Sequence, residues 1–251
     1  MKHTWLAAVF AVSLAACGGG GGDGDGGDNP EPATSAEGLW VGTTSTNRSF
    51  AALVLDDGTY WVLYSSQGNS AVVGGAIQGS GTSQSGSFTS SNGRDFSLEG
   101  LGVTNLTLNA NYVMKQSFNG TVRYTASGEQ VTFTSSYDSG YDLTPSLAAV
   151  AGSYSGSAAT SGGTEAANVS ISAAGAISGS GASGCTYSGS ATPRARGNVY
   201  DISVTFNGGV CANGTSTVSG VAYYDASTKQ ITSTALNDAR TDGFIYIGTK
   251  P

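Results

Sequence analysis

The sequence has 251 residues, with 39 Gly, 39% apolar residues, 11% charged residues and a formal net charge of −7. A helical bundle needs Ala, Glu, Lys and Leu in bulk, and a nucleic-acid binder needs clustered Lys and Arg, so the composition excludes both classes. The apolar content, which includes 12 Tyr, is enough to build a core. We therefore expect an extracytoplasmic all-β protein.

Residues 1–16 have the pattern of a secretory signal. Lys2 is followed by an apolar run over residues 5–16, which is too short to span a bilayer. The run leads into Leu14-Ala15-Ala16-Cys17, which resembles the lipobox of bacterial lipoproteins. That resemblance implies cleavage before Cys17, acylation of its sulfur and of the new amino group, and lasting anchorage through several acyl chains. Because Gly18 and not Asp follows the Cys, the resemblance also implies anchorage in the outer membrane. It does not indicate which leaflet of that membrane holds the anchor.

Residues 17–36 are predicted to be a flexible tether. This stretch contains a tract of Gly interrupted by Asp23, Asp25 and Asp28, and it has almost nothing apolar to bury. The alternation of Gly and Asp is superficially like calcium-binding repeats but lacks their apolar positions. We predict no metal and no cofactor.

The rest of the sequence contains a duplication with a shift of 100 residues. Residues 75–81 recur as residues 175–181. The same shift later pairs Gly120, Tyr124, Gln130 and Asp138 with Gly220, Tyr224, Gln230 and Asp238. The starts of the two halves, residues 38–42 and 152–156, are 114 residues apart, which indicates a surplus strand and turn around residues 59–69. We predict two tandem modules, residues 37–143 and 144–251, joined where Thr144 caps a short helical turn that begins at Pro145.

Within each module, apolar residues alternate with polar ones, as in Ile202, Val204 and Phe206. Turn signals such as Asn119-Gly120 recur every 8–12 residues. The pattern predicts a small antiparallel barrel or sandwich for each module. The many Gly within strands favour the barrel, since tight curvature needs bends and bulges.

The second module contains two cysteines, Cys185 and Cys211. In an oxidising compartment an isolated pair is typical of a disulfide. We therefore predict that the two are joined.

The sequence argues against an enzyme. Its one His, His3, lies in the predicted signal, so the mature chain offers no imidazole for nucleophile activation or a metal site. The remaining candidates are two carboxylate pairs, Asp138 with Asp142 and Asp238 with Asp242, which we expect to cap turns. No catalytic residue is assigned.

A binding patch is a second hypothesis. Tyr60, Trp61 and Tyr64 lie on a strand that is apolar on both faces, which suits either a binding patch or burial of one face in the barrel and the other against the neighbouring module. Arg194 and Arg196 lie inside the loop that the disulfide would close; they suit an acidic partner or simply solubility.

The anchor, the Gly-rich tether and the two starts of the form Gly-x-aromatic-x-Gly resemble, in general layout, the surface lipoproteins that bind transferrin or complement factor H. The resemblance implies a non-catalytic binding or surface-interaction role with an unknown protein partner, and it transfers no binding residue. Alternatives are a structural envelope lipoprotein without a ligand and a small-barrel carrier of an apolar molecule. Eight-stranded barrels often fill with their own side chains, which disfavours the carrier, whereas an interior cavity of several hundred cubic ångströms would favour it.

Overall fold

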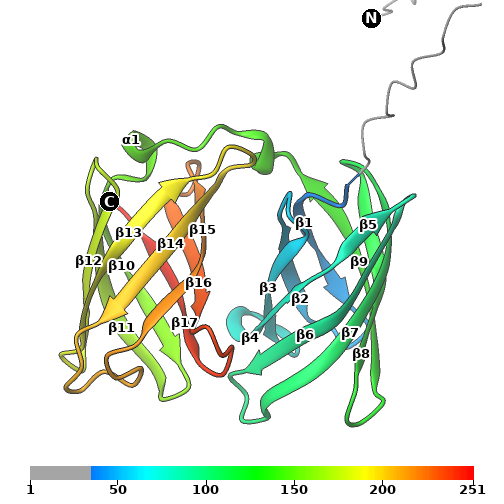
Figure 1. Ribbon diagram of the computed structural model, residues 1–251, viewed down its shortest axis with the longest axis horizontal. Coiled ribbons are helices and arrows are strands. Elements are labelled where there is room, and N and C mark those ends of the chain that lie inside the picture. The colour runs from blue at the N-terminus through cyan, green and yellow to red at the C-terminus, as the bar shows by residue number, and fades with distance from the viewer. Residues whose placement is uncertain (1–34) are drawn as a thin grey trace, which may run out of the picture. The chain divides into compact units, whose positions relative to one another are not determined.

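The computed structural model describes residues 35–251, which form two closed antiparallel β-barrels in tandem (Figure 1). The all-β prediction is confirmed, and the barrel is the correct alternative to the sandwich. The predicted signal, the lipobox with Cys17 and the tether up to residue 34 lie outside the described residues.

The first barrel is built from consecutive antiparallel strands, of which β4 pairs with β6 to close the ring. The short strand β5 pairs with β6 outside that ring. The strands are β1 (Gly38–Thr44), β2 (Ser49–Val54), β3 (Thr59–Ser66), β4 (Asn69–Ser80), β5 (Thr82–Gln84), β6 (Ser87–Ser97), β7 (Gly102–Val113), β8 (Ser117–Tyr124) and β9 (Gln130–Asp138).

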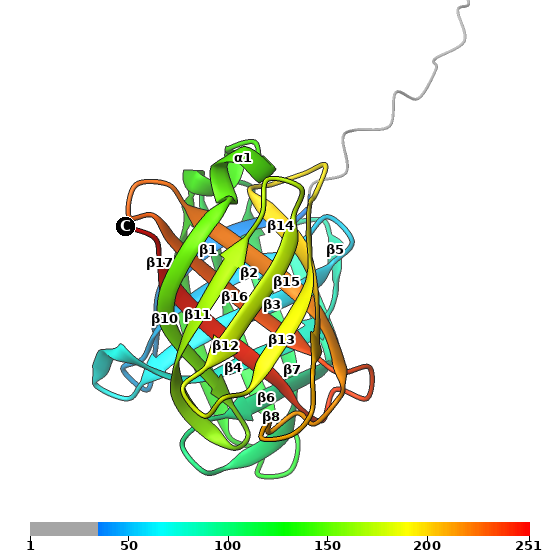
Figure 2. The same ribbon diagram turned by 90° about the vertical axis from the view of Figure 1, so that its left-hand side faces the viewer.

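The second barrel closes by pairing its last strand with its first. Figure 2 shows β10, β11, β12 and β13 side by side in the wall that faces the viewer. The strands are β10 (Gly152–Thr160), β11 (Gly163–Ile171), β12 (Ala176–Gly181), β13 (Thr186–Pro193), β14 (Val199–Phe206), β15 (Thr217–Asp225), β16 (Gln230–Leu236) and β17 (Gly243–Thr249).

Period-two burial places one apolar core inside each barrel. In β7, Leu106, Leu108 and Ala110 are buried while the residues between them are exposed or half-buried. In β14, Ile202 and Val204 are buried in the same alternating way. Successive side chains of a strand point to opposite faces, so this pattern fills the barrels from within.

The first strands of the two barrels are local copies of each other. The indole Nε1 of Trp40 donates to the carbonyl of Ala36, 2.9 Å away, and the hydroxyl of Tyr154 donates to the carbonyl of Val150, 2.5 Å away. Both rings are buried and both bonds reach back four residues. The similar starts of the two halves therefore mark equivalent structural positions.

The later matches of the duplication occupy different positions in the two rings. The shift of 100 residues pairs β4 with β12, β8 with β15 and β9 with β16. Counted from the first ring strand, each of these strands in the first barrel lies one position later than its match. The strand β3 lies in the predicted surplus, and β17 supplies the strand that closes the second ring. The second half thus lacks a counterpart of β3, and it completes its ring with β17 at its C-terminal end.

A short helical turn, α1 (Leu147–Val150), precedes β10. Its N-cap is Ser146, whose hydroxyl accepts from the amide of Ala149, and not Thr144 as the sequence suggested. Thr144 and Pro145 instead lie in the segment between α1 and a 3₁₀ turn, η1 (Ser139–Asp142).

A further apolar cluster joins the two barrels. It combines Leu53 and Trp61 of the first barrel with Val199 and Leu236 of the second, together with Tyr141 of η1. The unit that contains these residues extends from Thr34 to Pro251. Apolar side chains on the outer walls of both barrels are therefore buried against each other.

Candidate functional site

The first barrel contains a cavity of about 400 Å³. Its apolar wall comes from inward positions of several strands, among them Phe50, Ile77, Leu108, Phe118 and Phe133. Ligand pockets have volumes of roughly 300–1,000 Å³, so the size is suitable for a small molecule. The sequence argument that an eight-stranded barrel fills with its own side chains does not hold for this barrel.

The mouth of the cavity lies at one end of the barrel. The lining includes residues of the β1–β2, β3–β4, β6–β7 and β8–β9 turns, such as Thr46, Gln67, Leu101 and Ser127. In an up-and-down barrel alternate turns lie at the same end. Leu101 is 74% exposed there, so an apolar side chain stands at the entrance.

Aromatic rings form the inner part of the cavity and close the barrel beyond it. The ring centroids of Phe50 and Phe133, and those of Phe118 and Phe133, are 5.6 Å apart. Behind them Trp40 stacks on Phe118 at 5.6 Å, and Phe88 meets Phe118 edge-on. Trp40, Phe88 and Phe118 are almost fully buried, and the turn residues that line the cavity all lie at its mouth, so the cavity opens at that end.

Asp95 of β6 is a buried carboxylate in the wall of the cavity, with 5% of its surface exposed. The hydroxyl of Tyr64 donates to one carboxylate oxygen at 2.6 Å, and that of Tyr124 donates to the other at 2.7 Å. Burial raises the pKa of Asp95, and the two tyrosine hydrogen bonds oppose that rise. Burial and the nearby carboxylate also raise the pKa of both tyrosines, which therefore stay neutral and continue to donate.

Arg48 and Glu99 form an ion pair at the mouth. Their nearest charged atoms are 2.7 Å apart, and the guanidinium also donates to the carbonyl of Ser65 at 2.9 Å. The hydrogen bond between them raises the pKa of Arg48 and lowers that of Glu99. The Arg48 guanidinium lies 5.4 Å from the centroid of the Tyr64 ring, a cation–π geometry.

The second barrel differs because its interior is nearly full. Its cavity measures about 60 Å³. The loop over residues 207–216 covers the end that corresponds to the mouth of the first barrel, and Ala212 and Asn213 of that loop line the remaining space. A closed and filled barrel has no room for a ligand of ordinary size.

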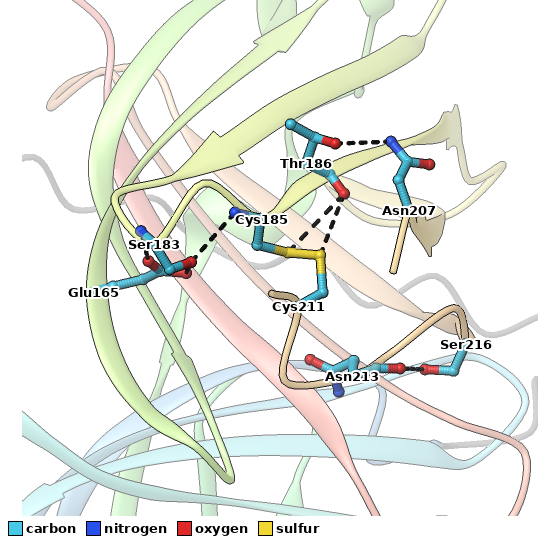
Figure 3. The surroundings of a disulfide bond; sticks show 8 residues. All are labelled: Glu165, Ser183, Cys185, Thr186, Asn207, Cys211, Asn213 and Ser216. Carbon is cyan, nitrogen blue, oxygen red and sulfur yellow. Dashed lines mark hydrogen bonds between the residues drawn. A yellow bond between two sulfur atoms is a disulfide. The ribbon is translucent and has the colours of Figure 1, made fainter. Parts of the chain in front are cut away.

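The predicted disulfide between Cys185 and Cys211 is present and holds this loop. Figure 3 shows the bond between the β12–β13 turn and the loop. The amide of Asn207 donates to the hydroxyl of Thr186 at 3.1 Å, and the hydroxyl of Ser216 donates to the carbonyl of Asn213 at 2.6 Å. The bridge and these hydrogen bonds fix the cover over the second barrel.

The aromatic residues of the predicted binding patch do not share one surface. Tyr60 is 1% exposed inside the first barrel, where its hydroxyl meets Ser90. Trp61 points the other way, into the cluster between the barrels. Tyr64 lines the cavity beside Asp95. The arrangement is the one expected if one face of the strand is buried in the barrel and the other against its neighbour.

Each of the two arginines named with that patch contacts a carboxylate of the first half of the chain, and Arg194 also contacts one of the second. Arg194 donates to Asp56 and to Asp201, both at 2.7 Å. Arg196 pairs with Glu37 at 2.5 Å. Neither arginine is near the cavity of the first barrel, so of the five patch residues Tyr64 is the one that belongs to it.

The carboxylate pairs act as turn residues. Asp138 accepts from the amide of Gly140 at the start of η1, and Asp142 pairs with Lys115 at 2.7 Å. Asp242 accepts from its neighbouring amide of Gly243 and from Ser161.

Sequence reasoning missed Asp95, Tyr124 and Arg48. A charged residue at an inward position of a strand was the available signal, since Asp95 lies between Arg94 and Phe96 in a segment of alternating pattern. Within residues 35–251 no group of three or more His, Cys, Asp or Glu is placed to hold a metal ion. Over the same residues, no helix is both long and apolar enough to cross a bilayer.

No known protein family matches the sequence, and no curated protein matches it either. Among solved structures, a candidate outer membrane protein of Bacteroides fragilis is 18% identical, with 85% of this chain and 96% of that chain covered and a TM-score of 0.26. Transferrin binding protein B of Neisseria meningitidis is 10% identical, with 82% and 66% covered and a TM-score of 0.29. That of Haemophilus parasuis is 9% identical, with 82% and 51% covered and a TM-score of 0.29. Likenesses this weak say nothing about function.

Proposed function

We propose that this chain is a non-catalytic binding protein of the bacterial envelope, and that the cavity of the first barrel is its site for a small, largely apolar molecule. The observation that carries the proposal is the difference between the two barrels. One holds about 400 Å³ of space behind an open mouth, and the other holds about 60 Å³ beneath a disulfide-bonded cover. A barrel of this size usually fills itself, so the space in the first barrel calls for an occupant.

The proposal keeps the organisation inferred from the sequence. The lipobox assigns an acylated Cys17, and residues 17–36 tether the modules, residues 37–143 and 144–251, to the outer membrane. One detail is adjusted at the end of the tether: Ala36 is fully buried, and its amide donates to the hydroxyl of Ser83 at 3.0 Å. The chain therefore joins the first barrel two residues before β1 begins.

The test is photolabelling of the cavity. Purified full-length protein in phospholipid nanodiscs is irradiated with a neutral alkyl diazirine alcohol of about octanol size, and labelled residues are mapped by peptide mass spectrometry. We expect saturable labelling of cavity residues such as Phe118 and Phe133.

Two tryptophan variants of the same barrel make the test specific. Val62 of β3 lines the cavity, so Val62→Trp should fill it and lower the labelling at least tenfold. Val113 of β7 is 52% exposed, so Val113→Trp should leave the labelling unchanged. Labelling that does not saturate, or that persists in Val62→Trp, contradicts the proposal.

A further inference from the structure

The cavity of the first barrel has an excess of negative charge. Four charged residues line it: Arg48, Asp95, Glu99 and Glu129. The one guanidinium is already paired with Glu99 at 2.7 Å and bonded to the carbonyl of Ser65. The balance of one positive and three negative groups leaves a formal charge of −2 around a largely apolar space.

Asp95 is the inner member of this set. In the part of the chain that the structure describes, its hydrogen-bond partners are two neutral hydroxyls, those of Tyr64 and Tyr124, and no Lys or Arg forms a salt bridge with it. An ionised carboxylate has about four acceptor positions, so about two stay available after the tyrosines have donated. Arg48 attracts Asp95 only at longer range. A buried carboxylate without a directly paired cation is costly, and a bound cation would offset that cost.

Aromatic faces stand beside the carboxylate. Arg48 lies over the ring of Tyr64, which indicates that this wall of the cavity already accommodates one organic cation. Phe50, Phe118 and Phe133 provide further rings deeper in the cavity. Organic ammonium groups are recognised by aromatic faces, most strongly where water is excluded.

We infer that the ligand of this cavity is a cationic amphiphile: an organic ammonium head held near Asp95 between the tyrosine rings, with an apolar body on the phenylalanine cluster. The inference rests on the proposed function and names the class of ligand. An anionic head would meet two uncompensated carboxylates and a guanidinium that is already paired. A neutral head would leave the buried charge of Asp95 with only the longer-range attraction of Arg48, whose guanidinium is hydrogen-bonded to Glu99.

The experiment compares three head groups on the same eight-carbon chain. Octyltrimethylammonium, octanol and octanoate compete separately against the photolabelling of the cavity by the neutral alcohol probe. We expect octyltrimethylammonium to compete at a concentration at least tenfold below that of octanol, and octanoate to be the weakest. Absence of any saturable labelling defeats the proposed function itself. If labelling is saturable but octanol or octanoate competes as well as octyltrimethylammonium, the cationic class of ligand is wrong. The cavity would then still be a binding site, as the proposed function states.

Asp95→Asn tests the residue that carries the inference. This variant should reduce the advantage of octyltrimethylammonium over octanol to less than about threefold. The control is Asp238→Asn, an exposed acid in the β16–β17 turn, which should keep the full advantage. If octyltrimethylammonium keeps its full advantage over octanol in Asp95→Asn, Asp95 does not hold the ammonium head and the inference is wrong.

A pH series on the unaltered protein gives a measurement that does not depend on the folding of a variant. The groups that surround Asp95 are Tyr64 of β3, Tyr124 of β8, Arg48 before β2, Glu99 in the β6–β7 turn and Glu129 in the β8–β9 turn. The trimethylammonium head does not titrate. Competition should therefore weaken as the pH falls through the raised pKa of Asp95, above the range in which an exposed Asp, with a pKa of about 3.9, takes up its proton. Competition constant from pH 8 to pH 4 contradicts the inference.

Discussion

At the scale of single residues, Asp95 differs from the other carboxylates of residues 35–251 whose pKa is shifted. Most carboxylates with a shifted pKa have it lowered by a partner, as Asp57 and Asp225 do through their turn hydrogen bonds. Asp95 has its pKa raised by burial, although two tyrosines donate to it. A residue that costs stability when it ionises is typical of a site whose purpose lies outside stability.

This gives a prediction for the pH dependence of folding. Because the folded state binds the Asp95 proton more tightly than the unfolded chain does, its contribution to the free energy of unfolding is greatest below about pH 3.9 and is lost as the pH rises through the raised pKa. The free energy of unfolding of the unaltered protein, minus that of Asp95→Asn, should therefore fall between pH 4 and pH 8. Urea unfolding at each pH measures both values, and a difference that stays level would show that Asp95 does not titrate in this window.

A second residue-scale prediction concerns the glycines of the first strands. A Cβ added to Gly42 would lie 2.0 Å from the carbonyl oxygen of Thr134, and one added to Gly156 would lie 1.9 Å from that of Ile247. In each barrel this is the contact between the first strand and the last. Gly156→Ala should therefore destabilise the protein by about 1–3 kcal/mol in urea unfolding, as overpacking does. The exposed neighbour Ser155→Ala is the control, and an equal loss in both variants would refute the close-approach explanation.

At the scale of elements, strand patterns and local signatures were predictable from the sequence and the ring order was not. The alternation in β14 and the shared starts of β1 and β10 depend on neighbours within a few residues, and the structure confirms both. The position of a strand in a ring depends on how the sheet closes. For that reason the 100-residue shift matches the sequences of β8 and β15, although β8 lies one position later in its ring than β15 does in its own.

The sequence could mark Asp95 as a charged residue in a strand, but for the same reason it could not indicate which residues surround it. Asp95 is 31 residues from Tyr64 and 29 from Tyr124, and β3, β6 and β8 are brought together by closure of the barrel. A single Asp in a strand has no spacing signature. The disulfide, in contrast, was predictable because the second module offers one pair of cysteines.

The disulfide-bonded loop carries the element-scale prediction. The bridge closes a segment with a sequence separation of 26 residues, for which chain entropy gives about 3.5 kcal/mol of stabilisation. The double variant Cys185→Ser, Cys211→Ser should lose roughly that amount in urea unfolding, and amide hydrogen exchange over residues 207–216 should rise because the cover over the second barrel is released. Added reductant should reproduce the loss in the unaltered protein and have no effect on the double variant. Unchanged exchange in the loop would mean that its hydrogen bonds hold it without the bridge.

At the scale of the whole molecule, two reciprocal arginines tie the barrels together. Arg94 of the first barrel donates to the carbonyls of Ala239 and Arg240, at 2.9 and 2.6 Å. Arg240 of the second donates to the carbonyls of Gln78 and Asn92, at 2.6 and 2.9 Å. Guanidinium groups bonded to carbonyls at this contact, next to the shared apolar cluster, should make the barrels unfold together.

Arg240→Ala tests that coupling and, through it, whether the ligand cavity depends on the second barrel. The variant loses two charge-assisted hydrogen bonds across the contact, each worth about 1.5–3 kcal/mol. Calorimetry should then resolve two thermal transitions, whereas we expect one for the unaltered protein. Since the cavity is lined entirely by residues of the first barrel, its photolabelling should survive in the variant. Arg123→Ala, an exposed arginine on β8, is the control and should keep a single transition. One transition in Arg240→Ala, at an unchanged midpoint, would mean that the apolar cluster couples the barrels and the arginines do not.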